Sequence, residues 1–274
     1  MTQTSNEIKY LLFDVESVPD GLSIASTRYP NAKLSPEEAL KKFRFELLQE
    51  SGRDFVPYTY HVPIAIVIAK IREDFSLAEI VSLDEPHHRP ATITKMFWKG
   101  WERYGRPTLV TFNGRSFDLP LMELSAYRYG VGVQAWFNIY DKAFEQYRNR
   151  YNVHSHLDLH ETLTNFGSSW FRGGLNLAAQ LIGKPGKIDV QGDMVQELFA
   201  AGRLTDISEY CRCDVLDTYF VFLRTMVVMG KISVDQENRL TTKVREILIE
   251  QSSKHPAYKT YLEHWNVLGI PVQD

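Results

Sequence analysis

Acidic residues occur at three places along the 274-residue chain where regular structure is expected. Asp14 and Glu16 follow an apolar run, Asp118 follows a turn signal, and Asp214 lies in a long amphipathic stretch. Unpaired carboxylates repel one another and are costly to remove from water, so four that converge from separate elements need a cation between them. Magnesium and manganese prefer oxygen ligands. The pattern therefore indicates a site for divalent metal ions held by these four side chains.

Each acidic group also has an ordinary explanation when it is taken alone. Asp118 could be the N-cap of a helix that begins near Leu119. Tyr210 and Asp214 are four residues apart and share one face of a predicted helix, but a tyrosine packed in the core beside a surface aspartate would give the same spacing. Asp217, about one turn further along, is a rival metal ligand. The order and context of the three groups favour the metal site.

Two predicted strands position the first two acidic groups. Residues 10–13 have the composition of a buried strand, and side chains two apart on a strand point to the same face, roughly 7 Å apart. Asp14 and Glu16 could thus share one ion. Residues 108–112 form a second β-rich run, and Asn113 opens a turn at its carboxyl end, where ligand sites form in open α/β sheets.

The rest of the chain alternates strands with helices, which predicts an α/β fold. A central strand is expected at 62–71 with a hairpin partner at 78–83, and a capping pattern beginning at Ser35 predicts a helix inside an insertion of unknown role at 20–60. Further helices are expected around residues 93–105, at 207–229, from residue 233 onward, and around 256–265. Asp206 and Glu209 are expected to form a capping box at the start of the helix at 207–229.

The three groups resemble the motifs of a known family, the tyrosine subtype of the DEDD-type 3′–5′ exonucleases in the ribonuclease H-like superfamily. The sequence is most similar to bacterial predicted exonucleases related to the exonuclease domain of family B DNA polymerases. The matching segments are 13–17, 112–118 and 210–214, and the likeness extends over residues 8–225. Relatives often carry threonine where this chain has Ser17, and serine keeps the hydroxyl.

The resemblance implies two-metal hydrolysis of phosphodiester bonds with magnesium or manganese. It implies that Asp14 bridges both ions, that Glu16 and Asp214 hold the ion on the nucleophile side, and that Asp118 binds the second ion through water. Tyr210 would orient the attacking water, and its ordinary pKa near 10 makes it a positioning group more than a base.

The implied substrate is nucleic acid, degraded from the 3′ end, with single-stranded DNA expected. RNA remains an alternative because the metals address only the phosphate, and an inactive nucleic-acid or partner-binding module on the same fold is a second alternative. Ser17, Asn113 and Arg172 are candidate substrate contacts. Asn113 could instead stabilise its turn, and the aromatic loop carrying Arg172 could either stack a base and hold a phosphate or pack against the protein.

The resemblance also implies the architecture, a ribonuclease H-like fold with a central mixed β-sheet flanked by helices. We expect residues 1–230, including the insertion, to form the exonuclease domain and residues 231–274 to form a helical extension packed on it. The net charge of −3 excludes a broadly basic nucleic-acid coat. No stretch is apolar enough to span a membrane and no signal peptide is evident, so we expect a soluble, cytoplasmic protein. Protein partners cannot be predicted.

Two further patterns are given a minor role. Residues 154–160 alternate polar and apolar side chains as on a strand, which could align three histidines and an aspartate in a zinc site or simply make one polar strand face. Cys211 and Cys213 point to different faces of a helix, so neither a disulfide nor a zinc knuckle is expected, and both are expected to be small buried side chains.

Overall fold

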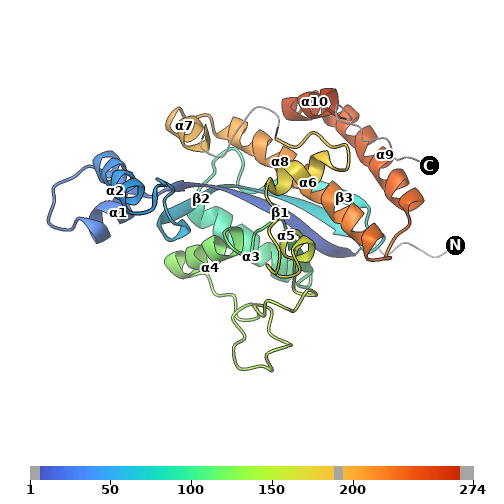
Figure 1. Ribbon diagram of the computed structural model, residues 1–274, viewed down its shortest axis with the longest axis horizontal. Coiled ribbons are helices and arrows are strands. Elements are labelled where there is room, and N and C mark those ends of the chain that lie inside the picture. The colour runs from blue at the N-terminus through green and yellow to red at the C-terminus, as the bar shows by residue number, and fades with distance from the viewer. Residues whose placement is uncertain (1–6, 188–193, 266–274) are drawn as a thin grey trace.

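A five-stranded mixed sheet forms the centre of the protein and carries helices on both faces (Figure 1). The structure is a computed structural model that describes residues 7–187 and 194–265. The strand order is β3-β2-β1-β4-β5, with β1–β2 and β2–β3 antiparallel and β1–β4 and β4–β5 parallel. The strands are β1 (Ile8–Pro19), β2 (His61–Arg72), β3 (Leu77–Ser82), β4 (Thr108–Thr111) and β5 (His156–Asp158). The expected mixed sheet and the β2–β3 hairpin are confirmed.

Successive side chains of β1 point to opposite faces of the sheet and enter two different apolar clusters. Leu11 and Phe13 point to one face and pack in a cluster with side chains of α3 (Pro90–Arg103) and α4 (Asp118–Tyr129). Leu12 points to the other face and packs in a cluster with α8 (Leu204–Val228). Asp14 has the same parity as Leu12, so the strand itself directs the acidic side chain toward α8.

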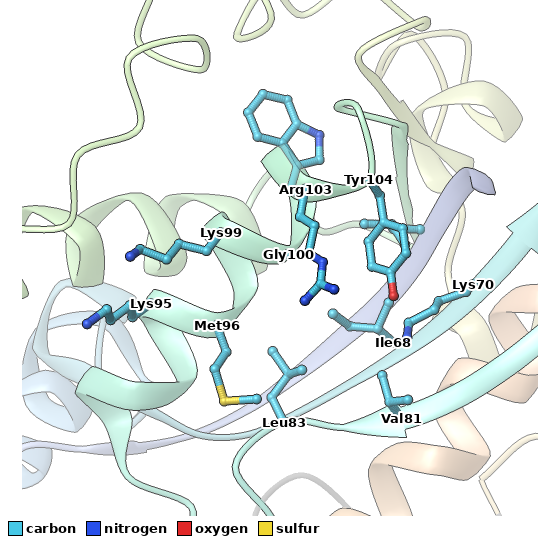
Figure 2. Close-up of a pocket in the computed structure, with 12 residues that line it drawn as sticks. Ile68, Lys70, Val81, Leu83, Lys95, Met96, Lys99, Gly100, Arg103 and Tyr104 are labelled. Atoms are coloured by element: carbon cyan, nitrogen blue, oxygen red, sulfur yellow. The ribbon is translucent and has the colours of Figure 1, made fainter. Parts of the chain in front are cut away.

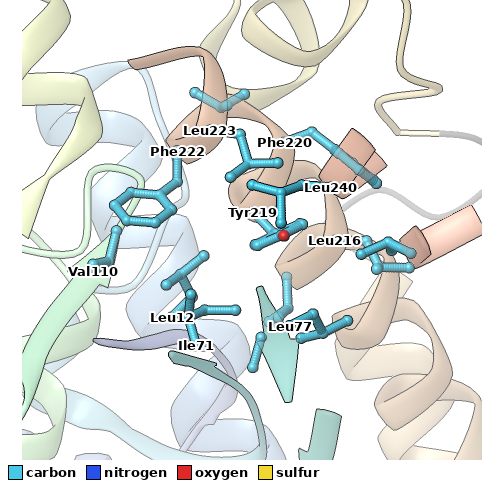
Figure 3. Packing of buried hydrophobic residues seen from close by; sticks show 14 of the residues in the cluster. Leu12, Ile71, Leu77, Val110, Leu216, Tyr219, Phe220, Phe222, Leu223 and Leu240 are labelled. Carbon is cyan, nitrogen blue, oxygen red and sulfur yellow. The ribbon is translucent and has the colours of Figure 1, made fainter. Parts of the chain in front are cut away.

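The two C-terminal helices pack into the same apolar cluster as α8. Helices α9 (Val234–Gln251) and α10 (Pro256–Glu263) add buried apolar side chains to the cluster that holds Leu12, Val110 and Phe222. Figure 3 shows how side chains from the sheet and from α8 meet there. Side chains of α9 and α10 thus extend the same core that joins α8 to the sheet.

The insertion forms a small helical unit at one end of the molecule (Figure 1). It contains α1 (Gly21–Arg28) and α2 (Pro36–Ser51), whose predicted capping box between Ser35 and Glu38 is confirmed. The two helices pack around their own apolar cluster. Arg128 of α4 forms an ion pair with Asp20 at the start of the unit.

The remaining elements are short: η1 (Tyr58–Tyr60), α5 (Leu159–Leu163), α6 (Gly174–Gln180) and α7 (Met194–Ala200). Among the described residues, no helix is long and apolar enough to cross a membrane. The predicted capping box at Asp206 is wrong, since α8 already begins at Leu204. Asp206 instead pairs with Arg203, and the Glu209 carboxylate accepts hydrogen bonds from Ala257 N–H and bonds to the His255 ring.

Candidate active site

Asp14 and Glu16 lie side by side within β1, on the face that meets α8. One ligand atom each from Asp14, Glu16 and Cys211 lie within 4.8 Å of one another. Both carboxylates keep part of their surface open to solvent, yet burial raises the pKa of each. The pKa of Glu16 lies well above its ordinary value, mainly through burial and then through the charges of Asp14, Asp214 and Asp118. The four predicted carboxylates therefore act on one another.

Asp118 begins α4 and does not cap it. The N-cap position belongs to Phe117, which makes no side-chain cap bond, and Asp118 is the first residue of the helix, with 8% of its surface exposed. Burial raises its pKa well above the ordinary value, followed by the charges of Asp14 and Asp158. The ordinary explanation of Asp118 as a helix cap is wrong, and its carboxylate is turned toward the same site as Asp14.

Tyr210 and Asp214 come to this site from one face of α8. They are 8% and 7% exposed, so Asp214 is a buried residue and not a surface aspartate. Burial, and then the charge of Asp14, raises the pKa of Asp214 to about 8. The pKa of Tyr210 is raised by burial and by Asp214, Glu16 and Asp14. Among the described residues its buried hydroxyl has no hydrogen bond of normal geometry, although it lies close enough to Asp214 for each to perturb the other.

Two residues at the site were not assigned a role from the sequence. Cys211 is fully buried, as expected, but its thiol also lies 3.4 Å from a carboxylate oxygen of Asp14 and can donate to it. Lys187 brings the positive charge that lowers the pKa values of Asp14, Glu16 and Asp214, and its Nζ lies 5.6 Å from the centre of the Tyr210 ring. Lys187 lies in a loop far from the acidic groups in sequence, and no spacing rule connects it to them.

A comparison with known proteins identifies the family of this chain. Residues 53–265 match the predicted 3′–5′ exonucleases related to the exonuclease domain of PolB. The chain belongs to this family. The matched segment includes Asp118, Tyr210 and Asp214 but begins after Asp14 and Glu16. The protein is thus a 3′–5′ exonuclease by family, a hydrolase of a type that uses divalent metal ions.

The chain is also similar to a solved structure. It is the family B DNA polymerase from the archaeon Pyrobaculum calidifontis, with 13% sequence identity and a TM-score of 0.47. The similarity covers 90% of this chain and 29% of the polymerase chain, so the exonuclease spans less than a third of that protein. No curated protein matches the chain.

Asp217, the rival ligand of the exonuclease, is engaged by the C-terminal helix. Its Oδ1 accepts a hydrogen bond of 2.6 Å from the Tyr261 hydroxyl. Burial raises its pKa to about 7, and Tyr261 and the Gly186 N–H counteract that rise. Asp217 thus connects α8 to α10, whereas Asp214 interacts with Asp14.

The loop of the second motif is held by Asp158. Its carboxylate accepts hydrogen bonds from the N–H groups of Asn113 (2.8 Å) and Arg115 (3.0 Å). It also accepts them from His160 (3.0 Å) and Glu161 (3.4 Å) in the first turn of α5. Asn113 adopts a positive φ of 64°, a conformation that asparagine tolerates better than most residues. Asp158 therefore fixes the turn that leads from β4 to Asp118.

The strand predicted at 154–160 is confirmed only over residues 156–158, and the structure does not form the zinc site considered there. β5 ends at Asp158, and the chain turns into α5, so the polar side chains do not share one face. His156 is buried and hydrogen-bonded to the Thr111 hydroxyl at 2.8 Å. In the described part of the chain, no histidine belongs to a group of side chains close enough together to bind a metal ion.

The predicted substrate contacts differ in their surroundings. The Ser17 hydroxyl lies next to Glu16 in sequence and is hydrogen-bonded to His61 Nδ1 at 2.9 Å. Asn113 is exposed, and its side-chain oxygen accepts a bond from the Ser116 hydroxyl. Arg172 is exposed and makes no ion pair or side-chain hydrogen bond with another described residue, while the neighbouring Phe171 packs on Phe112 at 6.2 Å. The aromatic loop thus both packs and leaves its arginine free.

The donor set fits divalent metal ions. Carboxylate oxygens suit magnesium and manganese, and four of them gathered in one place with raised pKa values are stabilised when a cation is added. None of Asp14, Glu16, Asp118 and Asp214 forms an ion pair with a described residue. The orphaned Tyr210 hydroxyl points to a further polar group, such as a water, at the same place.

Proposed function

We propose that this exonuclease removes nucleotides from the 3′ end of single-stranded DNA with two magnesium or manganese ions held by Asp14, Glu16, Asp118 and Asp214. One observation carries the proposal: burial raises the pKa values of all four carboxylates, and the charge of Asp14 raises those of the other three further. Folding such a cluster is unfavourable unless cations compensate it, and hydrolysis of phosphodiesters is the chemistry that two such ions perform.

The electrostatics support a central role for Asp14. Its charge raises the pKa of Glu16, Asp118 and Asp214 alike, which is expected of a residue between the others. When bound, two ions supply a nucleophilic water and stabilise the leaving 3′ oxygen. We assign Asp14 to both ions, Glu16 and Asp214 to the one on the nucleophile side, and Asp118 to the second.

Tyr210 would hold the attacking water. Its raised pKa keeps the phenol protonated at neutral pH, so the hydroxyl can orient a water but cannot act as a base in that state. The hydroxyl lies close to Asp214 but makes no hydrogen bond of normal geometry with any described residue, so it can still bind a water. Lys187, which faces the ring, leaves the cluster with a net negative charge that metal ions can neutralise.

We assign Ser17, Asn113 and Arg172 to the substrate. Ser17 is held by His61, whose pKa is lowered to about 4 by burial, so the imidazole is neutral at physiological pH and adds no charge beside the acidic residues. The chain retains all four carboxylates, which argues against an inactive binding module. RNA is the second candidate substrate. We also treat residues 1–230 as the catalytic unit and 231–274 as its extension.

The test is incubation of the purified protein with 5′-labelled and 3′-labelled single-stranded DNA, duplex DNA and RNA, with manganese, magnesium or EDTA. We expect a 5′-labelled strand to shorten progressively, release of mononucleotides, and no reaction in EDTA. Cleavage of a circular single strand would show an endonuclease and contradict the proposal. Faster degradation of RNA than of DNA would change the substrate while keeping the mechanism.

A further inference from the structure

A groove lies on the sheet face opposite the carboxylate cluster. It has a volume of about 380 Å³ and an aliphatic floor from three strands, made by Leu11, Ile68, Val81 and Leu83. Leu11 and Asp14 differ in parity along β1, so the groove and the acidic residues point to opposite faces of the sheet. Figure 2 shows the groove between β2, β3 and α3. It is therefore a feature separate from the nuclease chemistry.

Cations line the rim of this groove. Lys95, Lys99 and Arg103 follow one another at intervals of four residues and form one stripe of α3 (Figure 2). In the described part of the chain, these three exposed side chains make no ion pair, hydrogen bond or ring contact, and no acidic residue lines the groove. Lys70 on the opposite side is paired with Glu79 at 2.8 Å. Three positive charges on a chain of net charge −3 thus lie free around an apolar floor.

Helix α3 is less stable than it could be along this stripe. Like charges four residues apart repel, and a glycine inside a helix costs stability relative to alanine. Gly100 occupies such an interior position on the groove wall, and a Cβ atom built there would have nothing within 4 Å. No contact with the described residues therefore requires the glycine. Local rules that are broken without an internal reason indicate a functional surface.

We propose that this α3 groove is the docking site for an acidic peptide segment of a partner protein, one that carries apolar side chains next to aspartate or glutamate. The carboxylates would pair with Lys95, Lys99 and Arg103, and the apolar side chains would enter the space above Gly100. The aliphatic floor favours a peptide over nucleic acid, because bases stack on aromatic faces. The one exposed aromatic ring on the rim, Tyr104, is already engaged by Lys70 at 5.1 Å.

The test uses the full chain and a fluorescein-labelled peptide of four aspartates followed by two leucines and a phenylalanine. Binding is measured by fluorescence anisotropy in EDTA, together with a peptide in which asparagine replaces aspartate. Gly100→Phe fills the groove, and Lys95→Glu with Lys99→Glu reverses its charge. Lys41→Glu with Lys254→Glu is the matched control, because it makes the same change in net charge at exposed lysines away from the groove. Gly100→Ala, which needs no rearrangement, and thermal melting show that the helix still folds.

We expect saturable binding by the wild type and by the control pair, and a loss of affinity of about tenfold or more for Gly100→Phe and for the reversed pair. Exonuclease activity should be unchanged in all these variants. Absence of saturable binding, equal binding of the uncharged peptide, or full affinity in folded Gly100→Phe would overturn the proposal. Binding of oligothymidylate that only the groove variants lose would also overturn it, in favour of a nucleic-acid site.

Discussion

Replacing Asp214 by asparagine should stabilise the metal-free protein at pH 8 and remove most of its response to manganese. Burial and the charge of Asp14 raise the pKa of Asp214 from 3.8 to about 8. A carboxyl group with a raised pKa binds its proton more tightly in the folded than in the unfolded state. The folded state therefore loses stability as the pH rises from about 4 to 8. Asparagine carries no charge and avoids this loss.

The size of the effect follows from the pKa. The difference between 3.8 and about 8 sets an upper limit of about 6 kcal/mol, at about 1.36 kcal/mol per pH unit. The actual gain is smaller than this limit for two reasons. Part of the shift comes from the charge of Asp14, which can itself become protonated. The asparagine amide, if buried without hydrogen-bond partners, also costs about 1–3 kcal/mol. We therefore expect a net gain of about 2 kcal/mol at pH 8, which corresponds to about 4 °C in Tm for a chain of this length.

Manganese should remove most of the stability difference between the two proteins. An ion present at 100 times its Kd stabilises the folded wild type by about 2.7 kcal/mol, or about 5 °C. Asp214→Asn lacks one ligand and should gain less than half as much. Melting in EDTA and in manganese, at pH 8 and at pH 5.5, provides the assay. The advantage of the variant in EDTA should shrink at the lower pH, because Asp214 is then protonated in the folded wild type.

Asp217→Asn is the matched control, one turn further along α8. Its pKa is raised to about 7 by burial, so it too should melt higher in EDTA at pH 8. The side-chain oxygen of asparagine can still accept the bond from Tyr261, and the response to manganese should stay at the wild-type level. A full manganese response in Asp214→Asn would refute the ligand assignment. Loss of that response in Asp217→Asn would show that the wrong turn of the helix was chosen.

Three further changes separate catalysis, positioning and stability. Asp14→Asn should lower turnover by about three decades or more, because the charge of Asp14 acts on the other three carboxylates. Normal turnover would contradict the two-metal assignment. Tyr210→Phe should lower single-turnover rates by about 10- to 1000-fold while calorimetry shows unchanged manganese binding. An unchanged rate would make the tyrosine a packing residue. Gly100→Ala should raise the free energy of unfolding by about 0.5–1 kcal/mol in urea, and a decrease would mean that the glycine is needed structurally.

Short-range patterns predicted the elements that carry the site. Strand parity alone places Asp14 and Glu16 on one face, and the i, i+4 spacing places Tyr210 and Asp214 on one side of α8. Both rules depend only on backbone geometry within one element, so they need no knowledge of the fold. The capping box at Ser35 was predictable for the same reason.

Patterns that depend on the rest of the fold misled the prediction. The alternation at 154–160 fits a strand, but Asp158 accepts four N–H groups from two segments, and this ends the strand after three residues. Likewise Glu209 has the spacing of a capping residue but is held by His255 and Ala257, which lie far away in sequence. The spacing of residues in the sequence does not show which hydrogen-bond donors will surround a carboxylate in the folded protein.

The buried carboxylates of this protein differ in whether nearby N–H groups or cationic side chains compensate their charge. Asp158 is surrounded by N–H groups, and Glu161 forms ion pairs with Arg115 and Arg150. These charges are compensated within the chain and serve to fix its loops and helices. The four carboxylates of the cluster form no such ion pairs in the described residues, and their pKa values are raised. An uncompensated cluster lowers the stability of the protein on its own, so its presence is explained by the metal ions that it would hold.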